Sequence, residues 1–140
     1  MTLIVDAGPL YTQADRRDPD HKAVVEVLRA ERGSLVVPAF VAAEADFLIL
    51  NRLGIEAELA FLADLAAGTY VVDSLSQTEL RTAVDLARRY RDLELGLADA
   101  SVVVLAARHR THRLLTFDER AFRVLTPLQG GHFTLLPEDR

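Results

Sequence analysis

Short apolar runs that alternate with longer segments of helical periodicity are the feature of this sequence that most restricts its fold. Five runs have the length and residue types of buried strands, and they lie at residues 2–6, 35–38, 70–72, 113–116 and 132–136. The segments between them carry apolar residues at helical spacing, over residues 21–30, 39–53, 55–67, 76–90, 98–108 and, briefly, 118–124. Ser76 and Glu79 have the spacing of a capping box at the start of one of these helices. This alternation predicts an α/β sandwich with a mainly parallel sheet.

The composition indicates one folded domain over residues 1–140, because half of the residues are hydrophobic and glycine and proline are sparse. The absence of cysteine excludes thiol catalysis, disulfide bonds and cysteine-based zinc sites. We find no basic segment followed by an apolar run at the start, and no apolar run of membrane-spanning length, so we expect a cytoplasmic protein. The formal net charge of −5 does not decide whether the chain binds nucleic acid, because acids gathered in one metal site would account for most of it.

The first strand places a carboxylate where parallel sheets form their binding sites. Residues 3–5 are apolar and run directly into Asp6, and Gly8-Pro9 then breaks the strand. Ligands of open parallel sheets bind outside the carboxyl ends of the strands, so Asp6 is a candidate site residue. An aspartate in this position is also a good N-cap for the following helix, and the sequence leaves both interpretations open.

Glu44 is a second candidate, since it shares the apolar face of its helix with Phe40 and Leu48. A carboxylate on an apolar face is costly unless it is paired with an arginine or binds a metal. Asp46 points about 200° around the helix from Glu44, and we expect it to be an ordinary solvated acid. The helix is apolar on nearly all sides, which indicates either a buried core helix or an interface with another chain.

Asp99 and Asp118 are the remaining candidates. Asp99 lies in the first turn of a helix, in line with Val103 on its buried face, and the helix dipole does not explain an acid directed at the core. Asp118 follows the apolar run that ends at Thr116, so a second strand delivers a hydroxyl and an acid beyond its carboxyl end. Thr116 and Glu119 also fit a capping box, in which case Asp118 would be only a first-turn acid.

Together the four carboxylates predict a metal site. Two of them follow strands, two lie on helices that flank such ends, and no lysine is spread among them. Four carboxylates in one cleft would raise one another's pKa values unless a divalent cation binds. Oxygen ligands of this kind suit Mg²⁺ or Mn²⁺, and such an ion activates a bound water and stabilises in-line displacement at phosphorus.

Four short motifs, in this order and with this alternation of strands and helices, resemble the acidic motifs of PIN-domain ribonucleases. They are the strand that ends at Asp6, Val41-Ala42-Ala43-Glu44, Gly96-Leu97-Ala98-Asp99-Ala100 and Leu115-Thr116-Phe117-Asp118. Length and motif order are similar to those of the VapC toxins of bacterial toxin–antitoxin pairs. The resemblance covers essentially the whole chain and implies a PIN-like α/β/α sandwich with a central, mainly parallel five-stranded sheet. The first motif departs from the family in having Ala7 where threonine or serine is commoner.

The resemblance implies a metal-dependent endoribonuclease, the toxin of a type II pair, that hydrolyses RNA phosphodiesters with a metal-activated water. Asp6 and Asp99 would hold Mg²⁺ or Mn²⁺ most directly. Glu44 and Asp118 would complete the acidic metal site and orient the attacking water, and Thr116 would be a supporting catalytic hydroxyl.

The resemblance also implies three macromolecular partners. These are an RNA substrate, with tRNA or rRNA expected, a VapB-type antitoxin whose C-terminal segment enters the active-site groove, and a second copy of the chain in a homodimer. The apolar helical hairpin at 39–67 would then be an antitoxin-binding or dimer surface.

Two other functions stay open at this point. A magnesium-dependent phosphatase or phosphotransferase also uses acids at strand ends, although Asp6-Ala7-Gly8 lacks the second aspartate used by haloacid dehalogenase-like enzymes. A non-catalytic PIN-like binding module would use the same acids only to receive an arginine from a partner.

Basic residues gather after the helix at 98–108 and allow two interpretations. Arg108, Arg110 and Arg113 either stabilise the carboxyl end of that helix or contact RNA phosphates. His109 and His112 are three residues apart, but they lack the further ligands that a zinc site needs.

Overall fold

The computed structural model describes residues 1–140 and confirms the α/β fold with five strands. The strands are β1 (Thr2–Val5), β2 (Ser34–Pro38), β3 (Val71–Asp73), β4 (Arg113–Leu115) and β5 (Thr134–Leu136). They form one sheet in the order β3-β2-β1-β4-β5, and every neighbouring pair is parallel. β1 is therefore the central strand, between β2 and β4.

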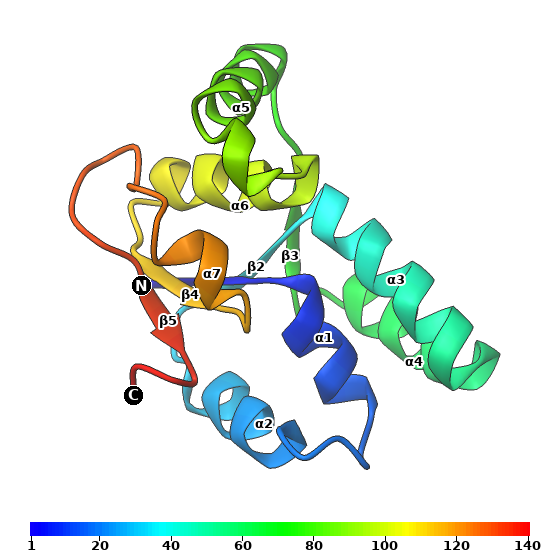
Figure 1. The fold of residues 1–140 in the computed structure, drawn as a ribbon. Helices are drawn as coiled ribbons and strands as arrows, with labels where there is room; N and C mark the ends of the chain where they lie inside the picture. Colours follow the sequence, from blue (N-terminus) through cyan, green and yellow to red (C-terminus); the bar gives the residue numbers. More distant parts are fainter.

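Helices connect the strands and cover both sides of the sheet. They are α1 (Ala7–Ala14), α2 (His21–Ala30), α3 (Ala39–Leu53), α4 (Ile55–Ala66), α5 (Gln77–Arg89), α6 (Leu97–Arg108) and α7 (Glu119–Phe122), with a short 3-10 helix, η1 (Arg91–Leu93). In Figure 1, α5 and α6 lie above the strands and α1 and α2 lie below them. The elements α7 and β5 are shorter than the predicted ranges 118–124 and 132–136. No helix is both long and apolar enough to cross a membrane.

The centre of the core lies between the sheet and α6. Every residue from Ala100 to Ala106 is buried, as expected for a helix that is apolar on all sides. Leu3 and Ile4 of β1 are fully buried as well. Asp6 directly follows β1 and Asp99 lies in the first turn of α6, so the most buried strand and the most buried helix position these two acids.

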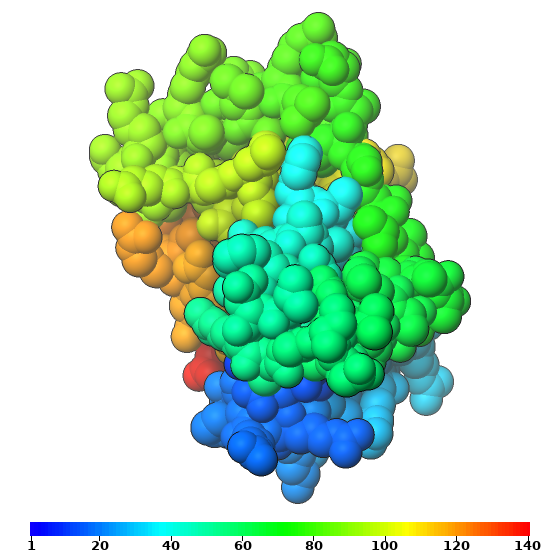
Figure 2. Space-filling view, turned by 90° about the vertical axis from the view of Figure 1, so that its right-hand side faces the viewer, coloured from blue at the N-terminus to red at the C-terminus, as the bar shows by residue number.

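Helices α3 and α4 form a hairpin that leaves apolar side chains uncovered. The turn between them is Gly54, whose φ of +94° is readily adopted only by glycine. Phe47 is 64% exposed, and Ile55 and Leu59 are each more than half exposed. Figure 2 shows the hairpin, in teal and green, on the face of the molecule that is turned toward the viewer. The exposed side of α3 favours the interface interpretation over that of a helix buried all round.

The expectation that Asp46 is a solvated acid is wrong. Asp46 is half-buried, and its Oδ1 atom is inaccessible and has no hydrogen-bond partner. Glu58 of α4 is only 9% exposed, and the neighbouring Asp46 carboxylate raises the pKa of Glu58. The sequence suggested solvent on this side of α3, but α4 folds back along it and covers it.

Candidate active site

A cleft of about 470 Å³ lies at the carboxyl end of the sheet, and acids from four separate segments line it. The four acids are Asp6, Glu44, Asp99 and Asp118, and the remaining lining residues are Gly8, Gly96, Leu97, Ala98 and Phe117. The register of the sheet explains the meeting of the first and last motifs. Val5 of β1 pairs with Leu115 of β4, so the residues that follow these strands, Asp6 and Thr116, are neighbours.

Asp6 is both a helix cap and a residue of the cleft, so the two interpretations of the sequence hold together. Its Oδ1 atom accepts a hydrogen bond from the Ala7 N–H at 2.8 Å, and its Oδ2 atom accepts one from the Thr116 hydroxyl at 2.7 Å. Asp6 is 8% exposed and Thr116 is 2% exposed. Burial raises the pKa of Asp6, although both hydrogen bonds act in the opposite direction. These contacts fix the orientation of the carboxylate.

Asp118 is itself the N-cap of α7, where the sequence suggested a capping box of Thr116 and Glu119. Its Oδ1 atom accepts a hydrogen bond from the Ala121 N–H at 3.1 Å. The Thr116 hydroxyl accepts a bond from the Asp118 N–H at 3.0 Å rather than capping the helix. Thr116 therefore links the two acids, because its hydroxyl donates to the Asp6 carboxylate and accepts from the Asp118 N–H.

Asp99 has the electrostatic surroundings that the sequence predicted for a crowded acidic site. Burial and then the charges of Asp6, Asp118 and Glu44 raise the pKa of Asp99 to about 7. A proton and a cation would therefore compete for the Asp99 carboxylate near neutral pH. The four acids of the cleft thus have no basic side chain beside them to balance their negative charge.

Glu44 lies in the cleft, but it is exposed and not buried on an apolar face as its helical neighbours suggested. The reason is that α3 borders the cleft at this turn, while Val41 and Ala45 face the core. Partial burial and the charge of Asp6 still raise the pKa of Glu44. Glu44 forms no ion pair, so the arginine partner that we considered is absent.

The donor set of the cleft fits a divalent cation that keeps part of its hydration shell. None of the ion pairs in the molecule includes any of the four acids, and no basic side chain lines the cleft. No three acidic or histidine side chains are close enough to enclose an ion among themselves. Magnesium is commonly held by one or two carboxylates with water completing its shell, so an open arrangement of this kind suits it.

The basic residues after α6 are engaged within the protein. Arg108 donates hydrogen bonds to both carboxylate oxygens of Glu79 and to the Ser74 carbonyl. His109 contacts Asp73 at 2.6 Å, and Arg113 pairs with Glu31. Glu79 also forms the capping box with Ser76 that the sequence predicted.

Arg108 and Arg113 form ion pairs with acids of other segments, whereas Arg110 has no ion pair. Contact of these arginines with RNA phosphates stays a prediction. His112 contacts the Gly130 carbonyl.

Three lining residues of the cleft received no role from the sequence. Leu97 is 50% exposed and Phe117 is 40% exposed, and both are apolar walls among the acids. Gly8 lies under the Phe117 ring, since a Cβ atom added there would be 3.3 Å from the ring. The position of Phe117 between Thr116 and Asp118 is the one signal in the sequence that could have drawn attention to it.

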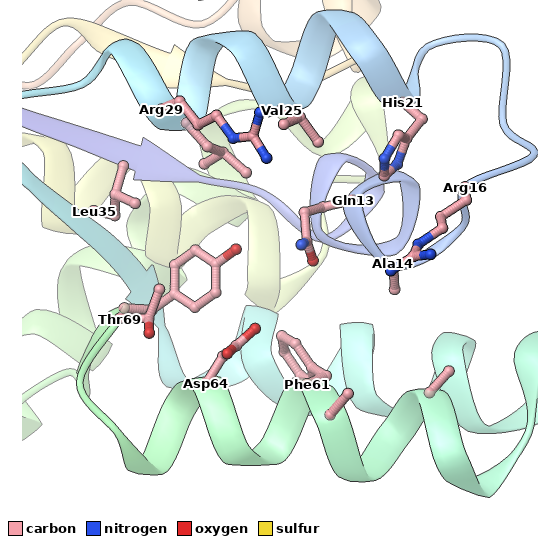
Figure 3. Close-up of a pocket in the computed structure, with 14 residues that line it drawn as sticks. Gln13, Ala14, Arg16, His21, Val25, Arg29, Leu35, Phe61, Asp64 and Thr69 are labelled. Carbon is pink, nitrogen blue, oxygen red and sulfur yellow. The ribbon is translucent and has the colours of Figure 1, made fainter.

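A second hollow of about 610 Å³ lies away from the acids, between α1, α2 and α4. Figure 3 shows side chains of α2, such as Val25 and His21, opposite Phe61 and Asp64 of α4. Arg16 and Arg29 also line this hollow, and neither takes part in an ion pair. The α2–α4 groove, as we call this hollow, thus combines an apolar floor with unpaired basic side chains.

Known proteins share both the sequence and the fold. Ribonuclease VapC26 of Mycobacterium tuberculosis is 41% identical over 135 residues, which is 96% of this chain and 100% of that protein. The crystal structure of VapC20 from the same organism, described as a sarcin-ricin loop cleaving toxin, superposes with a TM-score of 0.77 at 17% identity and covers 83% of this chain and 89% of its own. A toxin–antitoxin complex from Klebsiella pneumoniae gives a TM-score of 0.67 at 20% identity, over 89% of this chain and 97% of its own.

The family assignment follows from the most extensive of these matches. The sequence profile of the PIN domain matches residues 3–126, which include all four acidic motifs. The sequence identity with VapC26 extends over nearly the whole chain. The resemblance seen in the motifs is thereby confirmed, and the chain belongs to the PIN-domain family.

Proposed function

We propose that this protein is a divalent-metal-dependent endoribonuclease, the toxin of a type II toxin–antitoxin pair. The observation that carries the proposal is the cleft in which four acids from four segments meet with no basic side chain among its lining residues. The 41% identity with a ribonuclease supports RNA as the substrate, and we expect tRNA or rRNA to be cut.

We assign the metal to the two acids that the core holds most firmly. Asp6 and Asp99 would be direct ligands of Mg²⁺ or Mn²⁺, which when bound supplies an activated water and neutralises charge that develops at phosphorus. Thr116 keeps the Asp6 carboxylate in one orientation through its 2.7 Å hydrogen bond. Removing a hydrogen bond that orients a metal ligand commonly lowers metal affinity or activity by ~10–100-fold.

Glu44 and Asp118 have the remaining roles in this proposal. Each would accept a hydrogen bond from water in the cleft and so orient the attacking water toward the phosphate. Glu44 suits this task because it is the most exposed of the four acids and has no protein partner. Asp118 has only one oxygen engaged by α7, which leaves the other free for water.

The test compares wild type with Asp99→Asn on total cellular RNA, each with Mg²⁺, with Mn²⁺ or with EDTA. We expect discrete fragments only from wild type with metal, and a loss of at least ~100-fold in the variant. Asp85→Asn is the matched control, because Asp85 is an exposed acid of α5 without a hydrogen bond or ion pair. It should cut RNA as wild type does.

Other outcomes would replace the proposal. Equal cleavage by wild type and Asp99→Asn would show that the acidic cleft is not the site of RNA hydrolysis. Faster turnover of small phosphate esters than of RNA would favour a phosphatase, and no hydrolysis of either substrate by folded wild type would favour a binding module.

We also infer an antitoxin partner and a homodimer. Structures that share this fold include a toxin–antitoxin complex, which supports the first. The α2–α4 groove suits a partner segment with apolar side chains for Phe61 and an acid for Arg16 or Arg29. The exposed side of the α3–α4 hairpin suits a second copy. Arg29→Glu should weaken inhibition by the cognate antitoxin, and Leu59→Asp should reduce the dimer fraction in sedimentation.

A further inference from the structure

Phe117 combines an exposed aromatic ring with a fixed backbone. Its neighbours are held on both sides, Thr116 by the bond to Asp6 and Asp118 by the bond that caps α7. Its own carbonyl accepts a hydrogen bond from the Glu119 N–H at 3.0 Å. Even so, the ring stays outside the hydrophobic core and is 40% exposed. The backbone therefore presents an apolar ring to the cleft at a defined position.

Gly8 determines where the ring lies. A Cβ atom at residue 8 would be 3.3 Å from Cδ2 of Phe117, closer than ordinary van der Waals contact. The missing side chain lets the ring rest on the first turn of α1, next to Asp6. Leu97, at the start of α6, is 50% exposed and lines the same cleft. The acids thus lie in a cleft with two apolar side chains on its walls.

The composition of the cleft restricts which part of an RNA can contact these walls. No basic side chain lines the cleft, so the protein offers the phosphate no direct positive partner. The neutral and aromatic part of a nucleotide is its base, and bases stack on exposed aromatic rings. A base within a duplex is already stacked on its neighbours, so it would have to be unpaired to use Phe117.

We propose that Phe117 is a stacking platform for an unpaired nucleobase beside the scissile phosphate, with Leu97 as a second apolar contact. The inference rests on the proposed function and adds to it a residue that positions the substrate. Stacking of one base also gives the cleft a binding contact that does not depend on the cation.

The first experiment uses tryptophan fluorescence, because the chain contains no tryptophan. Phe117→Trp, combined with Asp99→Asn to prevent hydrolysis, is titrated with single-stranded oligoadenylate. We expect saturable quenching as a base stacks on the indole. A sugar-phosphate chain of the same length without bases carries the same charge and should cause no quenching. Val84→Trp in the same background is the control, since Val84 is exposed on α5 outside the cleft.

The second experiment measures cleavage. Phe117→Ala should raise KM for RNA roughly 5- to 150-fold, the range of alanine substitutions at base-stacking rings, while kcat changes less. Phe117→Tyr should keep KM near wild type because it keeps the ring. The melting temperature of Phe117→Ala should stay close to that of wild type, which separates positioning from a structural role. Val124→Ala, at an exposed position beyond α7, is the matched control.

The outcomes separate this inference from the proposed function. If wild type cuts RNA and Phe117→Ala does so with an unchanged KM, the stacking role is wrong and the nuclease activity stands. Equal quenching by the chains with and without bases would also overturn the stacking role alone. If quenching requires bases but wild type cuts no RNA, the stacking of a base on residue 117 is supported and the proposed nuclease activity is wrong.

Discussion

Acidic side chains gather in two regions at the same edge of the sheet, and their surroundings are opposite. At the end of β3, Asp73 and Glu79 are paired with His109 and Arg108. Arg108 lowers the pKa of Glu79 to about 2. No basic side chain lines the cleft, and burial with the neighbouring acids raises the pKa of Asp99 to about 7. The paired acids stabilise the fold, whereas the unpaired acids cost stability until a ligand binds.

The difference follows from how each region is built. The paired acids meet side chains from the end of α6, where Arg108 is the last helical residue and His109 follows it, beside the β3–α5 connection. The cleft is made of strand ends and helix starts, where hydrogen-bond donors are backbone N–H groups and one hydroxyl. Such donors orient carboxylates but do not neutralise them, so the cleft is suited to a cation from outside the protein.

The largest effect that would sharpen the comparison is the pH dependence of metal binding. At pH values below the raised pKa of Asp99, about 7, a cation must displace a proton from the Asp99 carboxyl group in order to bind. The affinity for Mn²⁺ should therefore fall about tenfold for each pH unit below 7 and level off above it. Calorimetric titrations from about pH 5 to 8 measure this, and an affinity that stays constant below pH 7 would be incompatible with a crowded acidic site.

The second prediction concerns the hydroxyl that orients Asp6. Thr116→Val removes the 2.7 Å hydrogen bond and leaves a buried carboxylate oxygen and the Asp118 N–H without a partner. We expect a loss of ~10–100-fold in metal affinity and RNA cleavage. Thr116→Ser, which keeps the hydroxyl, should retain most of both. Equal activity of the two variants would show that Asp6 does not depend on this bond.

The smallest predicted effect lies at the paired acids. Glu79→Ala removes the contacts with Arg108 and half of the capping box, and we expect a loss of about 1–2 kcal/mol in the free energy of unfolding at neutral pH. The loss should shrink as pH falls from about 4.5 toward 2, because the lowered pKa of Glu79 stabilises the native state only where that group is ionised. RNA cleavage should not change. Glu138→Ala, at an exposed acid near the carboxyl terminus, is the control for denaturant unfolding.

Three of the four acids of the cleft could be predicted because each one follows a local pattern that the structure retains, whereas the pattern used for Glu44, burial on an apolar face, does not hold. Asp6 and Asp118 come directly after apolar strands, and parallel strands bring their carboxyl ends to one edge. Asp99 stands in the first turn of a helix that is apolar all round. These patterns need only the order of the elements, not their detailed packing.

Other features depend on contacts between distant segments and could not be read in advance. Asp46 is half-buried because α4 folds over it, and nothing in α3 alone indicates this. Arg113 has its partner, Glu31, 82 positions away. The Phe117 ring lies against Gly8, which belongs to the first helix of the chain. Periodicity describes one element at a time, so it does not contain these pairings.

The most direct test of the account is the free energy of unfolding of wild type and Asp99→Asn at about pH 8, with and without Mn²⁺. The account predicts that, without metal, the variant is more stable than wild type by about 1–3 kcal/mol, because one repelling charge is gone. With Mn²⁺ the order should reverse, since only wild type gains the full binding energy of the ion. If the metal-free variant is less stable than wild type and Mn²⁺ changes neither, the acids are not an unpaired cluster that binds a cation.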